Sequence, residues 1–179
     1  MNIVFNRLKA NGEDNGYFEQ INDEAFPLSE RMSFDEIFDF ASDTNTDVLG
    51  IYDDKKPIGF VVLLKNEKCG YIYYLAMDSR IRSKGYGSAA IQKMIEVYSD
   101  LQLVLDFEVI DENAENNAQR IRRKNFYLRN GFHETGYYTM LRNDCFEVVC
   151  SGGELCKSAL KDLLCIIHAH RPEFPNILI

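Results

Sequence analysis

The sequence predicts a mixed α/β fold in which helices flank a central, twisted and mostly antiparallel sheet. The first observation is a series of three strand-like runs, "DVLGIY", "KPIGFVVLLKN" and "CGYIYYLAM", separated by the short polar turns "DDKK" and "NEK". This spacing predicts an antiparallel meander. The second observation is that strands and helices do not alternate strictly, so only part of the sheet can be parallel. A length of 179 residues suits one well-cored domain.

The first half of the chain supplies the elements around this meander. Apolar alternation predicts a strand within Asn2 to Ala10, and helical spacing then predicts helices over about Tyr17–Ala25 and Phe34–Ala41. After the meander, apolar residues recur at three and four from Gly85 to Tyr98, which predicts another helix. The run "LQLVLDFEVI" follows and indicates a buried strand.

The second half is predicted to hold a helix, a strand pair and a last helix. The polar stretch "DENAENNAQ" leads into a helix that ends at "YLRNGF", where Gly131 supplies the left-handed cap. Strands near Phe132–Leu141 and Phe146–Cys150 precede an amphipathic helix from about Glu154 to His168.

Composition argues against nucleic-acid and membrane partners. The net charge is −8, whereas phosphate backbones are bound through many Lys and Arg side chains. No apolar signal core opens the chain, and no apolar run approaches the roughly 20 residues of a membrane helix, so we expect a cytoplasmic protein. An odd number of cysteines without CxxC spacing is interpreted as reduced thiols that fill the core. They are Cys69, Cys145, Cys150, Cys156 and Cys165.

One basic, glycine-containing turn carries the first functional signal. The stretch "RIRSKGYGSAA" precedes a predicted helix and contains Arg80, Arg82 and Lys84. Amides at a helix N-terminus lack internal partners and carry the positive end of the helix dipole, so glycines there let them converge on a phosphate. A solvated basic turn would explain the same run, and the stretch alone does not decide between the two.

Two other phosphate-binding motifs compete for this turn. "GYGSAA" matches the dinucleotide pattern GxGxxG/A, and Asp106 and Glu108 lie where an acid that binds ribose is expected. That pattern places its glycines at the end of a strand, however, whereas "DSRIRSK" separates Met77 from Gly85. The P-loop pattern GxxxxGK[ST] is absent.

"LAMDSRIRSKGYGSAA" resembles the acetyl-CoA-binding motif of the GNAT acyltransferases, in which a strand is followed by arginine or glutamine, two residues, glycine, any residue and glycine. Arg82, Gly85 and Gly87 fill those positions. The second family signature, an acidic strand and a helix ending in "FYxxxGF", is matched by "LDFEV" and "FYLRNGF". We therefore expect an acetyltransferase domain over residues 1–150, with a C-terminal helix and tail over residues 151–179 packed on it.

The resemblance implies an acyl-CoA N-acyltransferase fold whose fourth and fifth strands splay apart around pantetheine. It implies that Leu75 and Met77 offer backbone groups to pantetheine, and that the Met77 amide is the oxyanion donor. The cofactor turn would comprise Arg82, Ser83, Lys84, Gly85, Tyr86, Gly87 and Ser88. The sequence departs from the family at Ser79, where many members have proline, and at Arg120, where many have an asparagine that contacts CoA. Arg120 is therefore expected to contact the cofactor in place of that asparagine.

Acetyl transfer from a thioester to an amine needs a neutral nucleophile, a donor for the oxyanion and a proton for the departing thiolate. Tyr127 is predicted to be the general acid. Three cations share its helical face and should lower its pKa, namely Arg120, Arg123 and Lys124. The alternative, a tyrosine at the rim of the core, is disfavoured because "FYLRNGF" follows the acidic strand.

Asp106 and Glu108 project from the same face of a strand otherwise built from Leu, Val and Phe. Either acid could take the amine proton, directly or through water, and their shared charge should raise the pKa of at least one of them. Glu108 is the preferred base. The alternative is a solvated polar face. No metal is expected, because the late cysteines and histidines are irregularly spaced.

These observations predict an N-acetyltransferase that uses acetyl-CoA as co-substrate and acts on a primary amine by direct attack in a ternary complex. From Glu13 to Asp54 there are thirteen acids and a single base, Arg31, in the segment that covers the acceptor in the resembling family. A cationic small-molecule or peptide amine is therefore expected. The amine itself and the oligomeric state, a homodimer included, stay open. Other functions to weigh are a CoA-binding regulator without turnover and an NAD-binding oxidoreductase.

Overall fold

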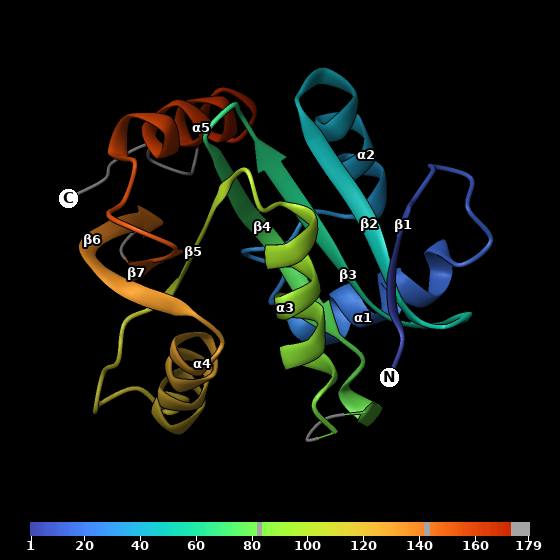
Figure 1. Ribbon diagram of the computed structural model, residues 1–179, viewed down its shortest axis with the longest axis horizontal. Helices are drawn as coiled ribbons and strands as arrows, with labels where there is room; N and C mark the ends of the chain where they lie inside the picture. Colours follow the sequence, from blue (N-terminus) through green and yellow to red (C-terminus); the bar gives the residue numbers. More distant parts are fainter. Residues whose placement is uncertain (82–83, 142–143, 173–179) are drawn as a thin grey trace. The chain divides into compact units, whose positions relative to one another are not determined.

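The computed structural model describes residues 1–81, 84–141 and 144–172. The strands and α-helices predicted from the sequence are present in the predicted order (Figure 1), and the short 3₁₀ helix η1 was not foreseen. In chain order the elements are β1 (Ile3–Arg7), α1 (Asn15–Ala25), α2 (Phe34–Asp43), β2 (Thr46–Asp53), β3 (Lys56–Lys65), β4 (Cys69–Met77), η1 (Ser79–Ile81), α3 (Tyr86–Val97), β5 (Gln102–Glu108), α4 (Asn117–Arg129), β6 (Phe132–Leu141), β7 (Asp144–Ser151) and α5 (Lys157–His170).

The strands form one seven-stranded sheet in the order β1-β2-β3-β4-β5-β7-β6. β1 and β3 flank β2 antiparallel, and β5 and β6 flank β7 antiparallel, whereas β4 and β5 are parallel. The predicted mixed, mostly antiparallel sheet is confirmed. The parallel ladder comprises three residue pairs and ends at Tyr71 and Val104, while β4 continues to Met77 and β5 to Glu108.

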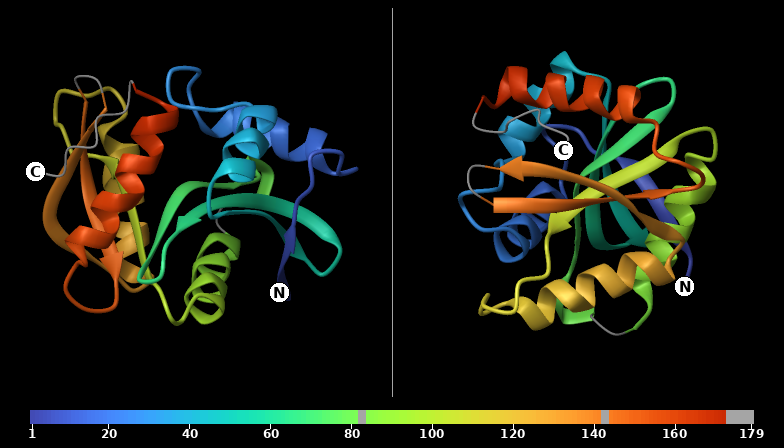
Figure 2. Two further views of the ribbon diagram at one scale, coloured as in Figure 1. Left: turned by 90° about the horizontal axis from the view of Figure 1, so that it is seen from above. Right: turned by 90° about the vertical axis from the view of Figure 1, so that its left-hand side faces the viewer.

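The chain divides into two compact units. The first unit comprises Met1–Leu64 and Ile72–Met94, and in it α1 and α2 lie on one face of the strands and α3 on the other (Figure 2, left). The second unit comprises Lys65–Tyr71 and Ile95–Ile179 and includes β6 and β7 side by side (Figure 2, right). The prediction for the tail over residues 151–179 lies partly outside the described residues, which end at 172.

Aromatic packing joins α1 and α2 to the strands of the first unit. α2 begins with a capping box in which Ser33 and Glu36 satisfy each other's backbone N–H groups. Its first residue, Phe34, stacks on Phe18 of α1 at 6.5 Å and meets the ring of Phe60 on β3 edge-on at 5.1 Å. Aromatic pairs of this geometry add to the free energy gained from apolar burial.

Two buried cysteines support the interpretation of the thiols as core residues. Cys69 and Cys150 are buried, and Cys145 and Cys156 are partly buried. Cys165 is exposed on α5, so the interpretation is wrong for this residue. Among the described residues, no helix has both the length and the apolar character that crossing a membrane requires.

A close approach between β3 and β4 holds the end of β4. A Cβ atom at Gly59 would lie 2.4 Å from the carbonyl oxygen of Ala76 and 2.8 Å from the sulfur of Met77. The backbone oxygen cannot move away without displacing β4. Glycine at this position is therefore a condition for the observed course of β4.

We expect Gly59→Ala to lower the free energy of unfolding by roughly 1–3 kcal/mol, the usual cost of an overpacked site. The matched control is Gly16→Ala in α1, where an added Cβ meets nothing within 4 Å. Thermal and urea unfolding of both variants checks this. Equal stability of the two variants would contradict the close approach.

Candidate active site

The chain leaves β4 through a turn held by the buried carboxylate of Asp78. Its Oδ1 accepts hydrogen bonds from the N–H and the Nε of Arg80, each at 2.8 Å, and its Oδ2 accepts one from the Tyr17 hydroxyl at 2.5 Å. The hydrogen bond from Arg80 lowers the pKa of Asp78 to about 2. Burial and the neighbouring Asp78 raise the pKa of Tyr17 to about 12. Arg80, one of the three cations of the basic turn, forms an ion pair with Asp78.

The glycine turn opens α3 as the sequence predicts. Gly85 has a φ of +83°, a left-handed conformation that favours glycine, and its carbonyl accepts the N–H of Ala89 at 3.0 Å. The amides of the next three residues, Tyr86, Gly87 and Ser88, therefore lie in the first helical turn, where no intrahelical acceptor exists. Arg82 and Ser83, both predicted to bind the cofactor, lie outside the described residues.

Side chains around the end of β4 are committed to the core of the first unit. Leu75, Met77 and Tyr86 pack against a buried cluster that includes Ile51. The Tyr86 hydroxyl also donates a hydrogen bond to Asp53 at 2.8 Å. These partly buried side chains leave the backbone groups of the three residues as the candidates for the predicted cofactor contacts. Lys84 is exposed beside them.

In the second unit, Asp106 is bound by two hydroxyl groups. Tyr71 donates to Oδ1 at 2.9 Å, and Thr139 donates to Oδ2. Burial raises the pKa of Asp106, although both hydrogen bonds act in the opposite direction. A raised pKa for one strand acid is as predicted, but its cause is burial and not the charge of Glu108.

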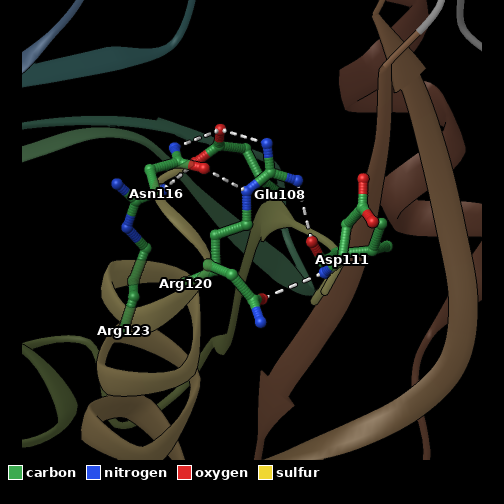
Figure 3. Close-up of polar contacts among 7 residues, drawn as sticks. Glu108, Asp111, Asn116, Arg120 and Arg123 are labelled. Atoms are coloured by element: carbon green, nitrogen blue, oxygen red, sulfur yellow. Dashed lines mark hydrogen bonds and ion pairs between the residues drawn. The ribbon is translucent and has the colours of Figure 1, made fainter. Parts of the chain in front are cut away.

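Figure 3 shows that Glu108 is held by two arginines of α4. Arg120 Nη2 lies 3.1 Å from Oε1, which Asn116 also contacts at 3.2 Å, and Arg123 Nη1 lies 2.9 Å from Oε2. Arg120 further donates to Asn116 and to the carbonyl of Val109. We call Glu108, Asn116, Arg120 and Arg123 the arginine clamp. Both carboxylate oxygens of Glu108 are therefore bound, and the guanidinium of Arg120, which was predicted to contact CoA, is paired with Glu108.

Tyr127 is packed by aromatic rings. It stacks on Phe107 at 5.7 Å with planes 5° apart, and it meets Phe132 edge-on at 5.7 Å. Burial raises its pKa to about 12, and only Arg123 acts in the lowering direction. The prediction of a lowered pKa is therefore wrong, because desolvation outweighs the nearby cation. The Tyr127 hydroxyl makes no hydrogen bond to the described residues of its own unit.

Among the predicted catalytic residues of this unit, Asp106 lies apart from Tyr127 and Glu108. Successive side chains on a strand face opposite ways, so Phe107, with Tyr127 stacked on it, faces away from Asp106. Glu108 and Tyr127 share one neighbour, Arg123. The third predicted cation, Lys124, is instead paired with Glu147 at 2.9 Å.

Sequence reasoning missed the partners of these residues. Tyr71 and Thr139 lie 35 and 33 positions from Asp106 in the chain, and nothing in their local pattern marks them. Asn116 offered a signal, because it stands four residues before Arg120 on the helical repeat. Tyr17 had none, since its partner Asp78 is 61 positions away.

The cysteines and histidines do not form a competing site in the described part of the chain. Cys150 Sγ lies 3.5 Å from His133 Nε2, but burial raises the pKa of this thiol to about 11, which disfavours the nucleophilic thiolate. No group of three or more His, Cys, Asp or Glu side chains among residues 1–81, 84–141 and 144–172 is arranged to hold a metal ion.

Solved structures share this fold. A Bacteroides thetaiotaomicron protein described as a GNAT-family member has 22% identity and a TM-score of 0.73, covering 93% of this chain and 96% of its own. The Vibrio cholerae spermidine N-acetyltransferase, in complex with CoA and spermine, has 14% identity, a TM-score of 0.59 and coverages of 83% and 94%. Arabidopsis thaliana Naa50, in complex with the bisubstrate analogue CoA-Ac-MVNAL, has 16% identity, a TM-score of 0.60 and coverages of 86% and 100%.

Sequence comparison gives the family directly. The chain matches none of the curated proteins with which it was compared. The family model described as "Acetyltransferase (GNAT) family" matches residues 15–132, which is more than half of the chain and includes both motifs noted in the sequence. The protein therefore belongs to the GNAT family of acetyltransferases.

Proposed function

We propose that the protein is an N-acetyltransferase that moves the acetyl group of acetyl-CoA to a primary amine by direct attack in a ternary complex. The observation that carries this proposal is the state of Tyr127. Its ring is fixed between Phe107 and Phe132, and its hydroxyl has no hydrogen-bond partner among the described residues of its unit. A rigid phenol with an open hydroxyl is suited to a reacting atom that arrives with the substrate.

The raised pKa of Tyr127 refines this role. With a pKa of about 12, the phenol keeps its proton at neutral pH. It therefore acts chiefly as a hydrogen-bond donor that stabilises the departing thiolate of CoA. The amine proton goes to one of the two acids of β5, Asp106 or Glu108.

The first unit supplies the groups proposed to bind CoA. The left-handed Gly85 starts α3, whose first-turn amides and positive dipole end suit the pyrophosphate. The backbone of Leu75 and Met77 at the end of β4 is proposed to bind pantetheine, with the Met77 amide as the oxyanion donor. These assignments rest on the family motif matched by this turn.

A cationic acceptor is proposed because exposed carboxylates gather on α1 and α2 of the first unit. They include Glu19, Glu24, Asp35, Asp39 and Asp43. Such a surface attracts a protonated amine before it is deprotonated for attack. The spermine and peptide-analogue complexes of the structural relatives name two acceptor classes to test, polyamines and peptide N-termini.

Cofactor binding is tested first. We expect acetyl-CoA, and not NAD, to raise the melting temperature, because a ligand bound only to the folded state stabilises it. Gly87→Val should weaken CoA binding measured by calorimetry, since a branched side chain would crowd the amides of the turn. The control is Gly153→Val in the second unit, where an added Cβ meets nothing within 4 Å. Equal CoA affinity in both variants would contradict the proposed turn.

Catalysis is tested at Tyr127. We expect Tyr127→Phe to lower kcat by roughly 10²-fold or more, the usual contribution of a hydrogen-bond donor aimed at charge that develops in the reaction, while CoA affinity and melting temperature change little. Thiol release from acetyl-CoA with spermine and with a peptide amine measures the rate. Tyr138→Phe, at an exposed tyrosine of β6, is the control. Full turnover in Tyr127→Phe would assign Tyr127 to packing alone.

A further inference from the structure

We infer that Asp106, and not Glu108, accepts the proton of the attacking amine, and that Tyr71 and Thr139 are the positioning residues of Asp106. The inference rests on the proposed acetyl transfer and deepens it by choosing between the two acids of β5. The choice follows from the kinds of hydrogen-bonding groups around each carboxylate.

Two of the three side chains that bind Glu108 are guanidinium groups, which can only donate. A guanidinium carries N–H donors and no acceptor, and the amide of Asn116 also approaches Glu108 through its nitrogen. A proton placed on Glu108 could be accepted in the arginine clamp only by the amide oxygen of Asn116, which already accepts a hydrogen bond from Arg120. It would also remove the counter-charge of two guanidinium groups. The Arg120 and Glu108 side chains are each only 18% exposed, so water would compensate this loss incompletely.

Asp106 is surrounded by groups that can reverse. A hydroxyl is both a donor and an acceptor, and both carboxylate oxygens of Asp106 are bound by hydroxyl groups, those of Tyr71 and Thr139. When Asp106 gains a proton, one hydroxyl can turn and accept it, so the hydrogen bonds survive in both protonation states. A base that is protonated and deprotonated in each turnover needs hydrogen bonds that are kept in both protonation states.

The surroundings of Asp106 point the same way. Asp106 is contacted by Tyr71 from β4 and by Thr139 from β6, and the residue paired with Asp106 on β7 is the apolar Val148. Glu108 is the nearest acid along β5, and Asp106 forms no ion pair with the described residues of its unit. Burial raises the pKa of Asp106, which makes it a stronger base, and the hydrogen bonds from the two hydroxyl groups act against this rise.

The proton balance of the step is as follows. The protonated amine first loses one proton to solvent. The neutral nitrogen then forms the new C–N bond, the C–S bond of the thioester breaks, and the second proton passes through water to Asp106, which faces away from Phe107 and Tyr127 on β5. The thiolate leaves with a hydrogen bond from Tyr127. Solvent then carries the proton from Asp106 to the thiolate, so that CoA is released as the thiol and Asp106 is ionised again.

The test compares Asp106→Asn with Glu108→Gln, two isosteric changes on one strand. The assay is thiol release from acetyl-CoA as a function of pH, with spermine, a peptide amine and the weakly basic 2,2,2-trifluoroethylamine, expressed per concentration of neutral amine. We expect Asp106→Asn to lower kcat/KM by roughly 10²-fold or more. The variant should also abolish the acidic limb of the pH profile, which is the decrease in kcat/KM as Asp106 becomes protonated at low pH. Glu108→Gln should lower kcat/KM by a factor that does not change with pH, so that the decrease in kcat/KM at low pH stays as in the wild type.

Variants of the two hydroxyl residues test the positioning role. Tyr71→Phe and Thr139→Val each remove a hydrogen bond that favours the ionised carboxylate, so the pKa of Asp106 rises and the acidic limb moves to higher pH. Thr139→Ser keeps the hydroxyl and should restore the wild-type limb. A merely structural role would change the rate without moving the limb.

Stability gives a readout that does not depend on turnover. Asp106→Asn should keep the melting temperature at neutral pH, because its amide can bond with hydroxyl groups that reverse. Glu108→Gln should lower it, because two guanidinium groups lose their counter-charge. Opposite ranking of the two variants would overturn the inference.

The kinetic outcomes separate the inference from the proposed function. No thiol release by the wild-type protein with any of the three amines would overturn the proposed function, and the role of Asp106 with it. Release by the wild type together with an intact acidic limb in Asp106→Asn would overturn only the assignment of Asp106. Loss of the limb in Glu108→Gln would do the same and make Glu108 the base.

Discussion

The ion pairs of Glu108 with Arg120 and Arg123 hold the helix on which the proposed chemistry depends. α4 has no fully buried residue, so ion pairs add to the packing of Tyr127 on Phe107 in holding it on the sheet. The arginine clamp ties one part of the helix to the end of β5, and Lys124 ties it to β7 through Glu147. Partly buried ion pairs of this kind are costly to break on one side only. These ion pairs and the rings of Phe107 and Phe132 together position the Tyr127 ring.

The order of strands and helices could be predicted from the sequence because each element has a strong local pattern. The meander from β2 to β4 is marked by long apolar runs and short polar turns, and Gly131 marks the end of α4 and indeed has a φ of +94°. The 3₁₀ helix η1 could not be predicted, since it depends on Asp78 closing the turn onto Arg80.

The sequence motifs point to candidate site residues, whereas the partners of these residues could not be predicted. The two motifs located Gly85, Asp106, Glu108 and Tyr127, but the spacing of charges on α4 suggested a phenol amid free cations. The cations are neutralised by Glu108 and Glu147, and the ring of Phe107 desolvates Tyr127, so its pKa rises. These contacts form only when β5, β7 and α4 come together, and no local pattern reports on them.

The arginine clamp and the acidic surface of α1 and α2 differ in how they respond to ionic strength. Exposed charges lose their mutual attraction beyond a Debye length, about 8 Å in physiological salt, whereas partly buried pairs are screened much less. The exposed carboxylates of α1 and α2 therefore act on a distant cation only in dilute salt, while Glu108 keeps its two arginines in concentrated salt. Added salt can thus slow the arrival of a charged amine while α4 keeps its place on the sheet.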